Sequence, residues 1–100
     1  VEKEFEISSD TRQTDNWVGG FIFKNNVKYT FSAKIFDDDS ENGIDNGRIS
    51  KLTVRRAYDD KQIANFDRGW DIYPRETALL TMLKCLIKKL NNLPYTDGRK

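Results

Sequence analysis

A long alternation of apolar and polar side chains, from residue 27 to residue 36, constrains the fold more than any other feature of the sequence. Its apolar members are Val27, Tyr29, Phe31, Ala33 and Ile35, and its polar members are Lys28, Thr30, Ser32 and Lys34. A period of two residues predicts a β-strand with one face in the core and one in water. Asn25-Asn26 precede it, and asparagine tolerates the left-handed conformation of a type I′ turn. Residues 21–36 are therefore predicted to form a β-hairpin.

Shorter alternating segments predict further strands. Residues 4–8 read as an edge strand followed by a loop to residue 16, and residues 49–57 and 62–66 read as two later strands. Between the loop and the hairpin, Gly19-Gly20 indicates a bulge or a close approach of two backbones.

The only convincing helix is predicted at residues 74–92. Pro74 suits the first position of a helix, and Glu76 complements the positive end of the helix dipole. A leucine stripe marks the buried side: Leu79, Leu83, Leu86 and Leu90. The pair Asn91-Asn92 and then Pro94 end the helix, and residues 95–100 are expected to form a loose tail.

These elements predict an α+β fold in a single domain covering residues 1–100. Residues 1–16 supply an edge strand and a loop, and residues 17–67 supply the sheet. We expect an antiparallel β-meander of about four or five strands with one C-terminal helix packed on one face.

Composition limits the classes of protein that this chain can represent. Residues 1–50 carry a net charge of −4 and residues 51–100 a net charge of +5, which favours a partner that meets a basic surface. The single cysteine, Cys85, excludes an internal disulfide and favours a reducing compartment. No apolar run approaches the roughly 18 residues of a membrane span, so we expect no membrane contact and a cytoplasmic location.

No pattern in the sequence predicts catalysis or a cofactor. Histidine is absent, and Cys85 is expected to be a buried, inert thiol beside the leucine stripe. The acidic loop of residues 37–47 partly matches a calcium-binding loop but has Ile49 where the last acidic ligand belongs. We therefore expect a non-enzymatic protein without metal, and a solvated acidic loop.

The stretch Asp67-Arg68-Gly69-Trp70-Asp71 concentrates groups that favour a binding site. Its glycine can take a positive φ. Trp70 is expected to cover one end of the core, and Arg68 to pair with a carboxylate such as Asp71. The alternative is a contact with a partner, because arginine and tryptophan are enriched at interface hot spots.

A second candidate surface consists of basic residues on the predicted strands. Lys28, Lys34, Lys51 and Arg55 are expected on the outward sheet face, with Arg56 close by. Such a face can contact phosphates or simply keep the sheet soluble. Sheets that bind single-stranded RNA also present aromatic rings, whereas Tyr29 and Phe31 are predicted to point into the core.

Three motifs carry a resemblance to a known group of proteins. They are Asn42-Gly43-Ile44, the run from Gly47 to Leu52, and the run from Phe66 to Asp71. From about Trp17 to Leu90 the chain resembles small proteins carried by phages, plasmids and other mobile elements of Gram-positive bacteria. Some similar proteins are anti-CRISPR proteins that act on type II systems.

This resemblance implies a non-enzymatic inhibitor that binds a type II CRISPR nuclease or blocks the loading of its guide RNA in the host bacterial cytosol. The predicted contact residues are Arg68, Lys51, Arg55, Arg56, Lys28, Lys34 and Trp70. The alternatives are an accessory protein that binds nucleic acid directly, and a phage structural or assembly component that pairs through an exposed sheet edge.

Overall fold

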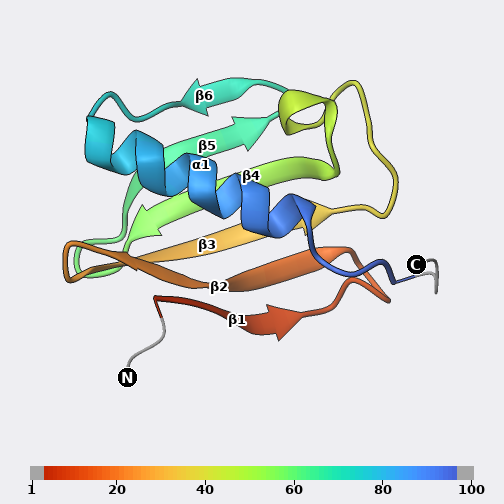
Figure 1. Ribbon diagram of the computed structural model, residues 1–100, viewed down its shortest axis with the longest axis horizontal. Helices are drawn as coiled ribbons and strands as arrows, with labels where there is room; N and C mark the ends of the chain where they lie inside the picture. The colour runs from red at the N-terminus through yellow and green to blue at the C-terminus, as the bar shows by residue number, and fades with distance from the viewer. Residues whose placement is uncertain (1–3, 97–100) are drawn as a thin grey trace.

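One layer of the structure is an antiparallel sheet in which every strand pairs with its neighbours in the sequence. The structure is a computed structural model that describes residues 4–96. One helix crosses this sheet and forms the second layer (Figure 1). The elements are β1 (Phe5–Asp10), β2 (Trp17–Lys24), β3 (Val27–Ile35), the short 3₁₀ helix η1 (Ile44–Asn46), β4 (Ile49–Arg56), β5 (Lys61–Asp67), β6 (Trp70–Ile72) and α1 (Thr77–Asn91). The predicted α+β meander is confirmed.

The sheet has six strands, where four or five were predicted. The additional strand, β6, has only three residues and pairs with β5 at the sheet edge. It begins at Trp70, within the candidate binding stretch of residues 67–71, and three residues are too few to display a period of two.

The β2–β3 hairpin matches its prediction closely. Asn25 and Asn26 have φ values of 52° and 65°, the left-handed pair that a type I′ turn requires. The turn sets the register, from Lys24 opposite Val27 at the turn to Trp17 opposite Lys34 at the far end. Because residues directly opposite each other share a face, this register decides which side chains of β2 meet the helix.

The core lies between α1 and the sheet face that it covers, here called the inner face. Tyr29 and Phe31 of β3 are 6% and 4% exposed, so their predicted inward orientation is confirmed. From the helix, Leu83, Leu86 and Leu90 are at most 1% exposed. Burial of each such side chain contributes roughly 1.5–3 kcal/mol, so helix docking is a large part of the stability of the domain.

The helix begins later than predicted. Glu76 has an extended backbone, with φ −72° and ψ 134°, and α1 starts at Thr77. Pro74 is buried and lies in the connection from β6 to the helix, not in the first helical turn. The chain must cross from the sheet edge to the inner face here, and extended residues cover that distance better than helical ones.

Cys85 is exposed, so the prediction of a buried thiol is wrong. The buried helix positions on either side of it are Met82, Leu83, Leu86 and Ile87. Cys85 lies beside this stripe, over a groove of about 500 Å³ between α1 and the β1–β2 edge of the sheet.

The two glycines of β2 have different structural roles. A Cβ on Gly20 would lie 2.0 Å from the carbonyl oxygen of Glu6 and 2.9 Å from the ring of Phe31. The missing side chain lets the Phe31 ring stack on Phe5 of β1, with 5.7 Å between ring centroids. A Cβ on Gly19 would meet only ordinary contacts at 3.5 Å and beyond. The predicted close backbone approach is therefore confirmed at Gly20.

The chain just beyond the helix is anchored. Thr96 donates two hydrogen bonds to the Asp37 carboxylate, at 2.9 and 2.8 Å. The prediction of a loose tail is thus wrong for Thr96, and Asp37 is not a solvated member of the acidic loop. The rest of the predicted tail, residues 97–100, and residues 1–3 of the predicted N-terminal segment lie outside the described residues.

Candidate functional site

The sheet face opposite the helix, here called the outer face, carries the predicted basic residues. Lys34 lies opposite Lys51 on the neighbouring strand, and Arg55 lies opposite Thr30. Lys28 continues the same alternation on β3, two residues from Thr30. Successive side chains of a strand point to opposite faces, and Tyr29 and Phe31 point into the core. The alternate residues Lys28, Thr30 and Lys34 therefore point outward. The prediction that these four cations share one face is confirmed.

Aromatic side chains lie on the same face, which the sequence interpretation missed. In β2, Phe23 is opposite Lys28, Phe21 is opposite Thr30, and Trp17 is opposite Lys34. All three rings are half-buried. Phe21 and Phe23 pack edge to face, with centroids 5.7 Å apart, and the Lys28 ammonium lies 4.7 Å from the centroid of Phe21.

A row of short side chains crosses the centre of the outer face. Cross-strand pairing joins Gly19 to Ser32, Ser32 to Thr53, and Thr53 to Asn65, one residue from each of four successive strands. We call these four residues the central trough. A hollow of about 310 Å³ opens here, lined by Ser32 and Thr53 of the trough together with Thr30, Phe31 and Arg55.

Carboxylates offset part of the positive charge on this face. Asp67 lies 3.8 Å from the Lys51 ammonium, and Asp60, in the β4–β5 turn, lies 3.7 Å from the Arg55 guanidinium. Both pairs are well exposed to solvent, so each contributes little to stability. Lys34 and Lys51 still face each other directly, an arrangement that disfavours folding slightly and that a bound anion would relieve.

Arg56 belongs to a different surface from the one predicted. It lies opposite Tyr29, whose side chain is in the core, and so is on the inner side of the sheet. Its guanidinium donates two hydrogen bonds to Asp59, at 3.2 and 2.7 Å, and lies over the exposed ring of Tyr58. The hydrogen bond from Arg56 is the main reason why the pKa of Asp59 lies below its ordinary value.

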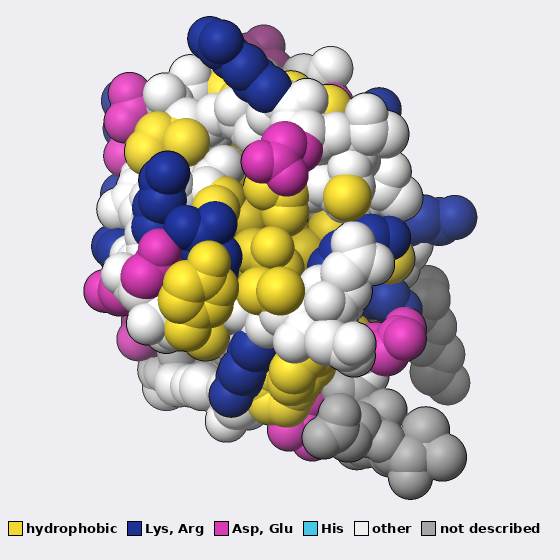
Figure 2. All heavy atoms as spheres, turned by 90° about the vertical axis from the view of Figure 1, so that its left-hand side faces the viewer, with side chains coloured by type: hydrophobic (Ala, Val, Ile, Leu, Met, Phe, Trp, Pro, Cys, Tyr) yellow, Lys and Arg dark blue, Asp and Glu magenta, His cyan; other side chains and the backbone are white. Residues whose placement is uncertain are grey.

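The β4–β5 turn with Asp59 lies at the end of the molecule shown in Figure 2, beside the β2–β3 turn and the start of α1. Hydrophobic side chains gather in the centre of that end, and basic and acidic side chains border them. Arg56 thus differs from the basic residues of the outer face in the face of the sheet from which it projects.

Arg68 and Trp70 lie at the β5–β6 edge of the sheet. Arg68 has a positive φ, 63°, although its neighbour Gly69 could adopt such a conformation more easily. Within residues 4–96 the Arg68 side chain makes no ion pair, so the expected pairing with Asp71 is not formed. Trp70 is 36% exposed and packs edge to face on Phe66, at 5.1 Å between centroids. It covers the edge of the core only in part.

The buried arginine of the structure is Arg48, which the sequence interpretation did not single out. Its side chain is 4% exposed and donates hydrogen bonds to the carbonyl oxygens of Phe36, Asn91 and Leu93, at 2.9, 2.9 and 2.6 Å. Phe36 directly precedes the acidic loop, Asn91 is the last residue of α1, and Leu93 follows the helix. Arg48 therefore holds the acidic loop against the C-terminal end of α1.

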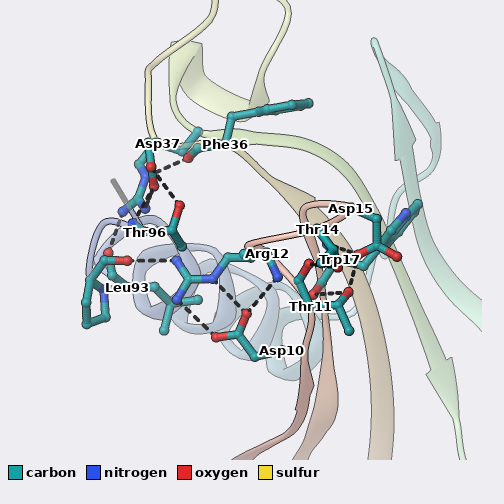
Figure 3. A network of polar contacts seen from close by, with 12 residues as sticks. Asp10, Thr11, Arg12, Thr14, Asp15, Trp17, Phe36, Asp37, Leu93 and Thr96 are labelled. Atoms are coloured by element: carbon teal, nitrogen blue, oxygen red, sulfur yellow. Dashed lines mark hydrogen bonds and ion pairs between the residues drawn. The ribbon is translucent and has the colours of Figure 1, made fainter. Parts of the chain in front are cut away.

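Figure 3 shows the polar contacts that continue this anchoring. Arg12, in the β1–β2 loop, donates a 2.7 Å hydrogen bond to the carbonyl oxygen of Pro94 and pairs with Asp10 at 3.0 Å. The network joins the β1–β2 loop and the β3–β4 connection to the segment after α1, and its bonds go to backbone and loop groups of the fold itself. We assign it a structural role.

Between residues 4 and 96 no three His, Cys, Asp or Glu side chains are grouped so that they could hold a metal ion. Over the same residues, no helix combines the length and apolar character that crossing a membrane requires.

The fold and this site define a class: a small α+β protein with one meander sheet, a single covering helix, and an uncovered face that combines cations with aromatic rings. The chain belongs to the family described as Domain of unknown function (DUF7678), whose model matches residues 16–91. That range includes β2 to β6, all of α1 and every outer-face residue named above from those strands. No curated protein and no solved structure matches the chain.

Proposed function

We propose that the protein is a non-enzymatic nucleic-acid-binding protein that holds a single strand on the outer face of its sheet. The observation that supports this most is the interleaving of cations and rings. Lys34 is flanked by Trp17 on one neighbouring strand and by Lys51 on the other, and Lys28 lies over Phe21. Cations attract phosphates, and aromatic rings stack on bases.

A single strand fits this face better than a duplex does. Proteins that read duplex DNA insert a helix or a β-ribbon into the major groove, which is about 12 Å wide. Here the candidate surface is the centre of a six-stranded sheet. The bases of a duplex are stacked on one another, so the rings of Phe21 and Trp17 would have nothing to stack on. Unpaired bases remove that difficulty.

Inhibition of a type II CRISPR nuclease, which the sequence resemblance implies, is a specific form of the same proposal. A face that binds single-stranded RNA favours interference with the guide RNA over occupation of a protein surface. The protein would then act in the bacterial cytosol, where the guide is loaded.

The direct test is a binding titration with a fluorescent RNA strand of about 12 nucleotides, a length that one small domain can contact. The variant K34A/K51A/R55A removes three cations from the outer face. The matched control, K84A/K88A/K89A, removes three exposed lysines from the helix and changes the net charge equally. Anisotropy is measured between about 50 and 200 mM salt.

We expect the outer-face variant to bind at least about tenfold more weakly, and its salt slope to fall by about 0.7 for each phosphate that the variant no longer neutralises. The control variant should keep most of the affinity and the slope. Equal losses of affinity in both variants, or no binding by the unmodified protein, would contradict the proposal. A DNA oligonucleotide of the same sequence shows whether the strand must be RNA.

The inhibitor form is tested by DNA cleavage with a type II effector, adding the protein before or after the guide RNA. Inhibition only when the protein is added first is the expected result, and it should be abolished in K34A/K51A/R55A. Inhibition in either order would place the interaction on the assembled complex instead.

A further inference from the structure

The central trough has a glycine at a position where an added Cβ would meet no close contact. Gly20 is required, because any side chain there would collide with β1 and with Phe31. Gly19 lies on the other face, opposite Ser32, and a Cβ at this position would meet nothing closer than 3.5 Å. Glycine within a strand weakens it unless something must approach closely. The missing side chain leaves the floor of the trough open.

Three of the four trough residues carry polar side chains, namely Ser32, Thr53 and Asn65. Ser32 and Thr53 make no side-chain hydrogen bond within residues 4–96, so both hydroxyls are free to donate to and accept from a ligand. Asn65 is partly engaged, since its amide donates to Gln62 at 3.0 Å. Two hydroxyls therefore face the hollow in the middle of the sheet.

Larger side chains border the trough on both sides. The row of Trp17, Lys34 and Lys51 lies two residues away along the strands in one direction, and the row of Phe21, Thr30 and Arg55 lies two residues away in the other. The two rows are about 13 Å apart, from a rise of about 3.3 Å per residue. Each row offers at least one cation and one aromatic ring beside a polar floor.

We infer that the bound single strand crosses the sheet at a right angle to the β-strands, and that a base lies in the trough over Gly19 with its edge against Ser32 and Thr53. This inference rests on the proposed function and adds the path of the strand and the residues that determine base preference. Phosphates meet Lys34, Lys51 and Arg55 along the borders. Lys28 leaves the ring of Phe21 when a neighbouring base stacks there.

The test uses Gly19→Val, which places a β-branched side chain on the trough floor. Valine suits a strand, and the nearest atoms at this position are at ordinary contact distance, so the fold should be retained. We expect an unchanged or higher thermal midpoint together with a loss of about tenfold or more in RNA affinity, about 1.4 kcal/mol, because the valine side chain occupies the place of the base.

A second variant, S32A/T53V, keeps the shape of the trough and removes both hydroxyls. The unmodified protein and this variant are titrated with oligonucleotides of A, C, G and U. We expect the affinity ratios among the four to move toward one while the salt slope stays the same, because no cation is changed.

Two results separate this inference from the proposed function. If Gly19→Val binds as the unmodified protein does, or if S32A/T53V keeps the base preferences, the trough is not the path of the strand. The outer face would still be the binding surface as long as K34A/K51A/R55A binds more weakly. If the unmodified protein binds no oligonucleotide, the proposed function and this inference both fail.

Discussion

Arg48 shows how one residue can matter to the fold without any pattern that reveals it. In the sequence it is one of 17 basic residues, in a strand-like run next to Ile49. In the structure it is the one charged side chain among the buried polar groups of residues 4–96. Its planar guanidinium donates in several directions at once, which suits three carbonyl oxygens that converge from separate segments.

Arg48→Met is expected to lower the free energy of unfolding by about 3–5 kcal/mol, the range for breaking a buried charged network by removing one partner. Three carbonyl groups would lose their donor, and the Asp37 carboxylate would lose a cation at 3.6 Å. Urea denaturation measures the change. Arg48→Lys serves as the control for charge. This variant should also be destabilised, because a single ammonium cannot make the three hydrogen bonds of the planar guanidinium. Full stability in the methionine variant would show that the hydrogen bonds contribute nothing net.

At the scale of elements, the edge strand β1 depends on Gly20 of its neighbour. Gly20→Ala forces its new methyl group against the backbone of Glu6 and the ring of Phe31, so we expect a loss of about 1–3 kcal/mol, as for other overpacked positions. Gly19→Ala is the matched control in the same strand and should change stability little. Hydrogen exchange should show reduced protection of β1 amides in the first variant only. Equal effects of the two substitutions would contradict the different roles assigned to the two glycines.

The outer face could have been predicted more fully from the sequence. Periodicity alone fails in β2, because Trp17, Phe21 and Phe23 are apolar and so are Val18 and Ile22 in the alternate positions. The two-residue turn resolves the ambiguity. With Asn25-Asn26 as the turn, Phe23 must lie opposite Lys28, and the rings then share a face with the cations.

Other features could not be derived from local patterns. The helix pattern predicted residues 74–92, but the start of α1 depends on how far the chain must travel from the sheet edge before it can turn. The positive φ of Arg68 depends on the pairing of β5 with β6, a strand too short to recognise. Exposure of Cys85 depends on how the helix is placed over the sheet, which leaves a groove between α1 and the β1–β2 edge. Each is set by tertiary packing, which overrides local preference.

At the scale of the whole molecule, Arg12 connects segments that are 82 positions apart. Its hydrogen bond to the Asp10 carboxylate is the main reason why the pKa of Asp10 lies below its ordinary value. Because the pKa of Asp10 is lower in the folded state, the ionised carboxylate stabilises the fold at pH values above the unfolded-state pKa of about 3.9. This stabilisation is lost as the pH falls through the pKa of the folded state.

We therefore expect Asp10→Asn to be less stable than the unmodified protein near pH 7, by at most about 1 kcal/mol because the carboxylate is partly exposed. The difference should shrink as pH falls below about 4. Urea denaturation of both proteins at several pH values checks the sign. A difference that grows toward acid pH would contradict the assignment.

The order of the strands also determines how this chain can be made. Because each strand pairs only with its neighbours in the sequence, the sheet can assemble hairpin by hairpin while the ribosome is still adding residues. The helix that covers the inner face is the last of these elements to emerge. Until then the nascent sheet presents its whole apolar face to solvent. The period of greatest aggregation risk therefore falls late in the synthesis of this domain, and it ends when Leu83, Leu86 and Leu90 leave the exit tunnel and dock.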